Sequence, residues 1–87
     1  MDEEKTKLMK RLNRIRGQVE AVRRALENEA GSAVVLQQAT ACRGALEGFI
    51  AEVIEDHIRE RVVQEPDPSA STKAAEELIG IVHSYLT

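Results

Sequence analysis

Few residues in this chain could do chemistry, and one histidine, His57, has an unusual position among them. It borders the apolar stretch of residues 31–65 and precedes Arg61 by one helical turn. A partly buried histidine is most often bonded to a carboxylate, but imidazole is also the commonest metal ligand. No serine or cysteine has a histidine base at a recognisable spacing, and no glycine-rich phosphate loop, HExxH or CxxC motif occurs. The sequence therefore predicts that the protein is not an enzyme.

The remaining reactive groups have simpler interpretations. The single cysteine, Cys42, excludes an intramolecular disulfide and suits a reducing interior. It lies on an apolar helical seam, where a small buried thiol is the expected role. The acids Glu52, Glu55, Asp56 and Glu60 cluster along one predicted helix, which a solvated face explains better than acid–base catalysis.

Charge is distributed unevenly along the 87 residues. Residues 1–24 contain eight Lys or Arg and four Asp or Glu, a net charge of +4, whereas the remainder contains four bases and eleven acids, a net charge of −7. A solvated helix face would explain the bases. A surface that contacts phosphates would explain them too, because arginine pairs with phosphate oxygens in bidentate geometry. The basic segment is therefore a candidate face for an anionic partner.

Three helices are expected to position these residues. Residues 2–29 contain apolar residues that alternate in steps of four and three, a heptad seam: Leu8, Leu12, Ile15, Val19, Val22 and Leu26. Residues 32–64 contain a second seam of the same spacing: Val35, Ala39, Cys42, Leu46, Phe49 and Val53. Gly31 is expected to end the first helix in a left-handed conformation, and Ser32 to cap the second.

Prolines at positions 66 and 68 predict a break, followed by a short third helix over residues 71–86. The fold class is therefore all-α, in one domain over residues 1–87. No apolar run approaches the ~18 residues that span a bilayer, and the polar N-terminus does not resemble a signal peptide. The long second helix is too apolar to be covered by this chain alone. We expect it to pack against copies of itself or against a partner.

The helices contain five short segments that together resemble the copper-sensitive operon repressor family, which includes nickel/cobalt-responsive and formaldehyde-responsive repressors. They are RGQ at 16–18, LQQ at 36–38, RGA at 43–45, AEV at 51–53 and HIRE at 57–60. The last two are most similar to the formaldehyde and nickel/cobalt branches. The resemblance covers nearly the whole chain. It implies a three-helix protomer whose two long antiparallel helices form a four-helix bundle in a dimer, with dimers pairing into a tetramer.

The resemblance also implies a cytoplasmic DNA-binding repressor that a small effector releases from its operator. The effector site of the family spans two protomers and corresponds here to Ser32, His57 and Arg61, with Glu77 at the place of a glutamate that can hydrogen-bond the histidine. Only His57 matches the family's ligands. Ser32 stands where the family has a cysteine, and a hydroxyl is a weak ligand for soft metals and stays protonated near neutral pH. Arg61 removes a third ligand and adds a positive charge.

Three explanations of Ser32 remain open. It is an engineered replacement for cysteine, a native residue of a diverged member, or part of a site in which the N-terminal amine, His57 and acids hold a divalent ion such as zinc, nickel or cobalt. A native, diverged site is favoured, because Arg61 departs from the family pattern as well.

The basic segment and the resemblance together predict a set of DNA contacts with Arg11 foremost: Lys7, Lys10, Arg11, Arg14, Arg16 and Arg43. The expected partners are a double-stranded DNA operator and further copies of the chain, and no membrane. The alternative is a helical protein-interaction adaptor without DNA binding, whose seams bind a partner helix and whose bases only keep it soluble.

Overall fold

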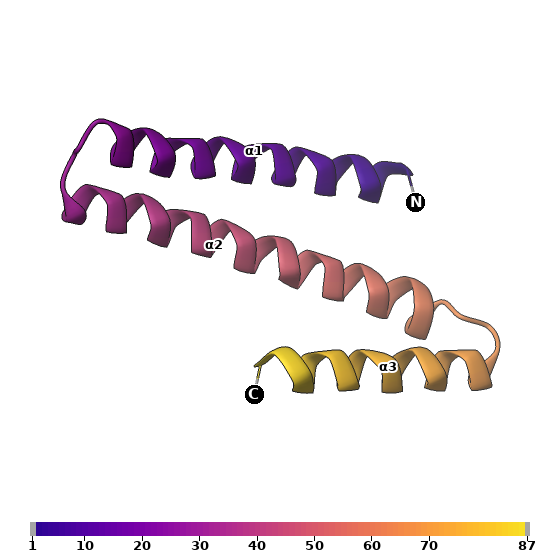
Figure 1. Ribbon diagram of the computed structural model, residues 1–87. Coiled ribbons are helices and arrows are strands. Elements are labelled where there is room, and N and C mark those ends of the chain that lie inside the picture. Colours follow the sequence, from indigo (N-terminus) through magenta and orange to yellow (C-terminus); the bar gives the residue numbers. More distant parts are fainter. Residues whose placement is uncertain (1, 87) are drawn as a thin grey trace. The chain divides into compact units, whose positions relative to one another are not determined.

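The structure is a computed structural model that describes the backbone of residues 2–86 and the side chains of residues 3–85. All regular structure in that range is helical: α1 (Asp2–Glu27), α2 (Ser32–His57), η1 (Ile58–Val63) and α3 (Pro68–Leu86) (Figure 1). Because η1 continues α2 without a break, the predicted all-α class with three helices is confirmed. The chain divides into two compact units, residues 1–52 and 53–87, so that a single domain remains a prediction. None of the helices described combines the length and apolarity that crossing a membrane requires.

The turn that ends α1 differs from the prediction. Its left-handed terminating residue is Glu29, with φ of 51°, rather than Gly31. The Glu29 N–H donates to the Leu26 carbonyl at 3.2 Å, and the Ala30 N–H donates to the Ala25 carbonyl at 3.0 Å. These two bonds form a Schellman motif, which satisfies the last carbonyls of the helix. A glutamate adopts this conformation at some cost, and glycine would have been the expected choice.

Gly31 instead redirects the chain into α2. Its φ of 95° lies in the left-handed region, and its carbonyl accepts the Val35 N–H at 3.1 Å, the first hydrogen bond of the helix. Ser32 is exposed, and its hydroxyl makes no hydrogen bond to another described residue. The predicted capping role of Ser32 is therefore wrong.

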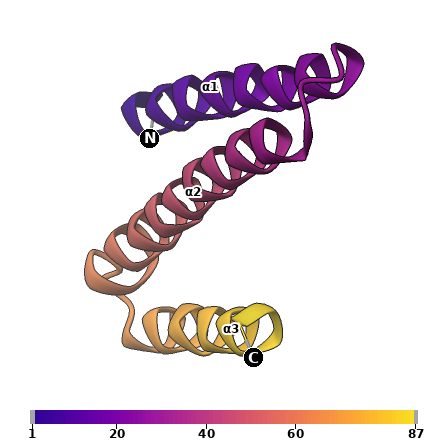
Figure 2. The same ribbon diagram turned by 90° about the vertical axis from the view of Figure 1, so that its left-hand side faces the viewer.

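In the first unit, α1 runs antiparallel to the first part of α2 (Figures 1 and 2), and each seam is only half covered. On α1, Ile15 is buried and Leu8 and Val22 are half-buried. The alternate seam residues remain largely open, with Leu12, Val19 and Leu26 at 43%, 52% and 62% exposure. The same alternation holds on α2, where residues 35, 42 and 49 are half-buried and residues 39 and 46 are exposed. One position of each heptad packs within the hairpin, and the other is left uncovered.

The second unit begins within α2, which ends at His57 rather than continuing as an α-helix to residue 64. The last six helical residues, Ile58–Val63, are a π-helix, closed by a bond of 2.9 Å from the Gln64 N–H to the Arg59 carbonyl. Nearby, the Ser71 hydroxyl donates to the Val62 carbonyl at 2.9 Å and ties α3 to η1. π-Helical turns are rare and are frequently found at functional sites, and this one directly follows His57.

The helix α3 begins at Pro68, three residues earlier than predicted. Asp67 caps it, because its Oδ1 accepts the Ser69 N–H at 3.1 Å and its carbonyl accepts the Ser71 N–H at 2.9 Å. The prediction was wrong because proline interrupts a helix only in its interior. At the first helical position the missing N–H would have had no partner within the helix, and the fixed φ is already helical.

Candidate functional site

The predicted DNA-binding bases of the first unit include a pair held by a buried acid. Lys7 Nζ lies 2.7 Å from Oε1 of Glu52, and Arg11 Nε forms an ion pair with Oε2 of the same carboxylate. Glu52 is only 8% exposed, whereas the side chains of Lys7 and Arg11 are 69% and 43% exposed. The expectation that Glu52 belongs to a solvated acidic face is therefore wrong. The acid joins the beginning of α1 to the C-terminal part of α2 and leaves both cations at the surface.

The heptad spacing of α2 contained a signal for this burial. Glu52 follows Gln38 and Ala45 at intervals of seven residues, and both of these side chains are half-buried. Residues seven apart lie on nearly the same side of a helix. Continuing this line from Ala45 places Glu52 on the covered side, although its charge favours the surface.

The cations lower the pKa of Glu52 from its ordinary value of 4.5. The largest cause is the hydrogen bond from Lys7, and the charge of Arg11 acts in the same direction, while the burial of the carboxylate raises the pKa. A lowered pKa means that the folded protein stabilises the ionised carboxylate. The contribution of Glu52 to folding is thus fully present above its ordinary pKa and is lost as the pH falls through the folded-state value.

This linkage predicts a stability difference that depends on pH. We expect Glu52→Gln to lower the melting temperature at neutral pH, because Lys7 and Arg11 lose their charged partner. The gap to the unmodified chain should narrow as the pH falls below 4.5, where the native carboxylate also becomes neutral. Thermal melts of both chains from about pH 7 to about pH 3 measure it, with the exposed Glu55→Gln as the control. Parallel curves for Glu52→Gln and the unmodified chain would contradict the assignment.

The other predicted DNA-binding residues are open at the surface. Lys10, Arg14 and Arg16 are exposed on α1 and form no ion pair or hydrogen bond with another residue of the described part. Arg43, on α2, lies 3.7 Å from Glu47, and both side chains are more than two-thirds exposed. Exposed pairs of this kind contribute little to stability, so Glu47 restrains Arg43 only weakly.

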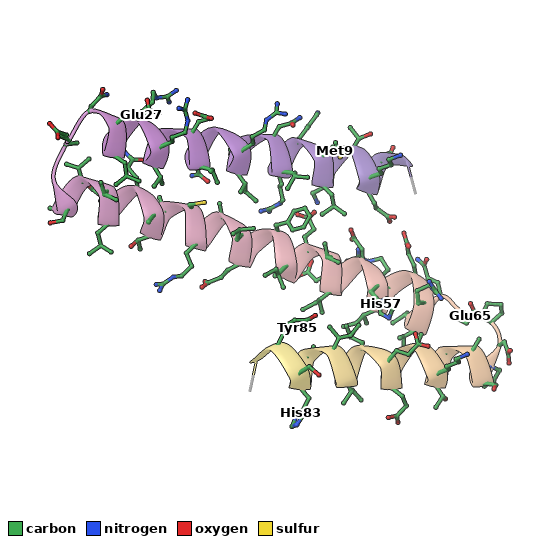
Figure 3. All side chains as sticks on the ribbon, viewed as in Figure 1. Met9, Glu27, His57, Glu65, His83 and Tyr85 are labelled. Carbon is green, nitrogen blue, oxygen red and sulfur yellow. The ribbon has the colours of Figure 1, made fainter. Side chains whose placement is uncertain are left out.

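His57 belongs to the second unit and faces α3 (Figure 3). Its Nε2 lies 3.2 Å from the carbonyl oxygen of Ala74, a residue that is only 4% exposed. Because a carbonyl can only accept, Nε2 is the donor in this contact, and Nδ1 is the ring nitrogen that the contact leaves open for another partner. The other histidine, His83, is exposed and points away from this contact (Figure 3).

The other residues of the predicted effector site do not meet His57 within the unit that contains it. Arg61 and Glu77 are exposed, and the ring contact of His57 is to the backbone of Ala74, one turn before Glu77. Ser32 belongs to the first unit. In the described part of the chain no three His, Cys, Asp or Glu side chains are grouped so that they could hold a metal ion. The N-terminal amine lies outside the described residues. The described donors of one chain therefore do not fit a complete metal site.

A hollow beside the α1–α2 turn was not predicted from the sequence. It has a volume of about 680 Å³ and is apolar, with Ser32 among its lining residues together with Ala25, Leu26, Val35 and Leu36. Its walls include the last seam residue of α1, Leu26, and the first two seam residues of α2, Val35 and Ala39. The candidate effector residue Ser32 thus borders an apolar surface that the single chain leaves open.

Comparison with known proteins relates the chain to transcriptional repressors by sequence and by structure. Residues 4–84 match the family described as metal-sensitive transcriptional repressor. The chain is 41% identical over 81 residues to an uncharacterized protein in the bioA 5′ region of Serratia marcescens, covering 92% of this chain and 89% of that protein. It is 35% identical over 83 residues to the transcriptional repressor RcnR of Salmonella paratyphi B, covering 95% and 92%.

Among solved structures, a variant of the formaldehyde-responsive regulator FrmR from Salmonella enterica serovar Typhimurium is similar, with a TM-score of 0.89 and 35% identity. The similarity covers 98% of this chain and 97% of that one. The helices described above are therefore those of a known repressor fold, formed over nearly the full length of the chain.

Proposed function

The chain belongs to the metal-sensitive transcriptional repressor family, and we propose that it binds a double-stranded DNA operator through α1 and releases it when a small effector binds at His57. The family is one of repressors rather than enzymes. The observation that supports DNA as the partner most directly is the charge of residues 1–24, +4 within a chain of net charge −3. Phosphate contacts provide most of the affinity of such surfaces for DNA.

We assign the phosphate contacts to the predicted set on α1, with Arg43 of α2 as a further member. Lys10, Arg14 and Arg16 support the assignment, because they are exposed and no described acid neutralises them. Lys7 and Arg11 pair with the buried Glu52, yet 69% and 43% of their side chains remain exposed at the surface. Arginines in such positions can bind phosphate oxygens through two parallel hydrogen bonds.

The exposed half of each heptad seam supports the proposal that the functional protein is an oligomer of this chain. Leu12, Val19 and Leu26 remain exposed on α1, and Leu46 and Ile50 on α2 are 42% and 49% exposed. Apolar surface of this extent is typical of an interface. We propose that a second chain covers it in a four-helix bundle, that two dimers pair into a tetramer, and that the single-domain protein acts in the cytoplasm.

The effector site is proposed at His57, with Ser32, Arg61 and Glu77 near it in the assembled protein. His57 offers one imidazole nitrogen, Nδ1, without breaking its bond to Ala74. Among metals, a divalent ion such as zinc, nickel or cobalt suits an imidazole better than copper(I), which prefers thiolates. Formaldehyde, to which the similar FrmR is responsive, would lack its cysteine nucleophile at Ser32. We therefore infer a native, diverged site with a weak response to soft metals and to formaldehyde.

Identification of the operator tests the proposal. Sequencing of DNA crosslinked to the chain in cells should yield a defined site, and the purified protein should bind it with an affinity that falls steeply with salt. Light scattering should give a mass near four times the 9.6 kDa of the chain. A monomer that gains helicity only with another protein, and that enriches no DNA, would point to the adaptor and refute the repressor.

A further inference from the structure

The side chain of Arg11 lies against two residues of α2 that are one turn apart, Gly48 and Glu52. Glu52 pairs with its Nε, and a Cβ added to Gly48 would lie 3.0 Å from its Nη1. The guanidinium therefore lies over the one position in this turn of α2 that has no side chain. Gly44, one turn earlier on the same helix, has no atom within 4 Å of the equivalent position.

This arrangement restricts an otherwise flexible side chain. A free arginine loses considerable rotamer entropy when it binds a phosphate, and less is lost if the side chain is already fixed. Glu52 engages Nε on the inner edge of the guanidinium, and Arg11 still has 43% of its side chain exposed. The remaining N–H groups can donate to a phosphate without breaking the pair with Glu52.

We propose that Gly48 and Glu52 are positioning residues that hold the guanidinium of Arg11 in place for an operator phosphate, an inference that rests on the proposed function. Neither residue touches the DNA in this arrangement. The glycine provides the space and the carboxylate provides the charged partner. Because both belong to α2, the conformation of a DNA-binding residue on α1 depends on the helix that also contains His57.

The matched pair Gly48→Ala and Gly44→Ala tests the glycine. Both changes replace an interior helical glycine by alanine without altering charge, and Gly44→Ala, which enters open space, should raise the melting temperature. Only the methyl group at position 48 should displace Arg11, by a few tenths of an ångström or more. We expect operator affinity, measured by fluorescence anisotropy, to fall about three- to tenfold for Gly48→Ala and to stay unchanged for Gly44→Ala. If Gly48 had only a structural role, Gly48→Ala would lower operator affinity only to the extent that it lowers the melting temperature.

Arg11→Ala as a second background separates this inference from the proposed function. In that background Gly48→Ala should have no further effect on affinity. Glu52→Asp keeps the charge but withdraws it by one methylene, and should weaken binding more when Arg11 is present than in its absence, where Lys7 is the remaining partner of the carboxylate. Equal affinities of Gly48→Ala and Gly44→Ala, or a weakening by Gly48→Ala that persists without Arg11, would overturn the positioning role. Tighter binding by Glu52→Asp would also overturn it, since Glu52 would then compete with phosphate. If Arg11→Ala itself binds normally, the proposed DNA interaction of Arg11 fails instead.

Discussion

We expect the replacement of Arg11 and Arg14 together by alanine to reduce operator affinity at least about a hundredfold. Each arginine is exposed on α1 and can make charge-assisted hydrogen bonds to phosphate, which are roughly twice as strong as neutral ones. In a symmetric assembly the double substitution is present in every subunit that contacts DNA, so the loss of affinity is multiplied. The slope of log affinity against log salt should become shallower by about 0.9 for each phosphate that the variant no longer neutralises. Anisotropy titrations at several salt concentrations measure both quantities.

A control of equal charge is available on the same helix. Arg23 and Arg24 lie near the end of α1, and Arg23 is already paired with Glu20 at 2.9 Å and with Glu27. Changing these two residues to alanine also removes two positive charges, but should reduce affinity far less. The mass of the assembly should stay the same in both double variants. If the two variants weaken binding equally, only net charge matters and α1 has no specific DNA-binding face.

We expect Ser32→Cys to give the protein an effector-driven release of operator DNA that depends on the new thiol. The unmodified chain should stay bound in the presence of copper(I) or formaldehyde, because the hydroxyl of Ser32 neither ionises near neutral pH nor binds soft metals well. A thiolate at this position, beside the apolar hollow at the α1–α2 turn, supplies the missing nucleophile and ligand. Release requires that the effector bind one state of the protein more tightly than the other. We expect at least a tenfold change in operator affinity, about 1.4 kcal/mol, at saturating effector.

The neighbouring position provides the control. Ala33→Cys adds the same thiol to an exposed residue of α2, about 100° further around the helix, and should not respond. Combining Ser32→Cys with His57→Ala should abolish any metal response and tests the histidine. Strong release by the unmodified chain would contradict the prediction. A Cys42→Ala variant would then show whether the native thiol, which is half-buried, is responsible.

The helices could be predicted from the sequence because their seams are regular, but their ends could not. Whether Pro68 breaks or begins a helix depends on Asp67, whose side chain caps the first turn. Because glycine usually ends a helix in the left-handed conformation, Gly31 was the predicted terminating residue of α1. In the structure Glu29 takes this role, with the two hydrogen bonds of a Schellman motif, although a glutamate rarely adopts a positive φ. The π turn after His57 has no sequence signal that we recognise. Each of these depends on local hydrogen bonds rather than on the apolar pattern.

The candidate site was only partly predictable, for a different reason. The bases of α1 are visible in the sequence as a local excess of charge. The burial of Glu52 depends on Lys7 and Arg11, which are more than forty residues away in the chain and meet it only after the hairpin forms. Burying a carboxylate costs free energy unless the group is paired. The charge of Glu52 alone therefore predicted an exposed position. The contact of His57 with the Ala74 carbonyl likewise requires α3 to pack beside η1.

If a second chain covers the exposed heptad positions, as proposed, the persistence of this repressor depends on its concentration. The chain by itself buries only one position of each heptad, and association would add stability in an amount that mass action sets. Each tenfold dilution below saturation removes about 1.4 kcal/mol for every association step. A newly made chain at low abundance is thus poorly protected from proteolysis, whereas an established pool protects itself. The level of repressor in a cell would consequently rise more steeply than its rate of synthesis.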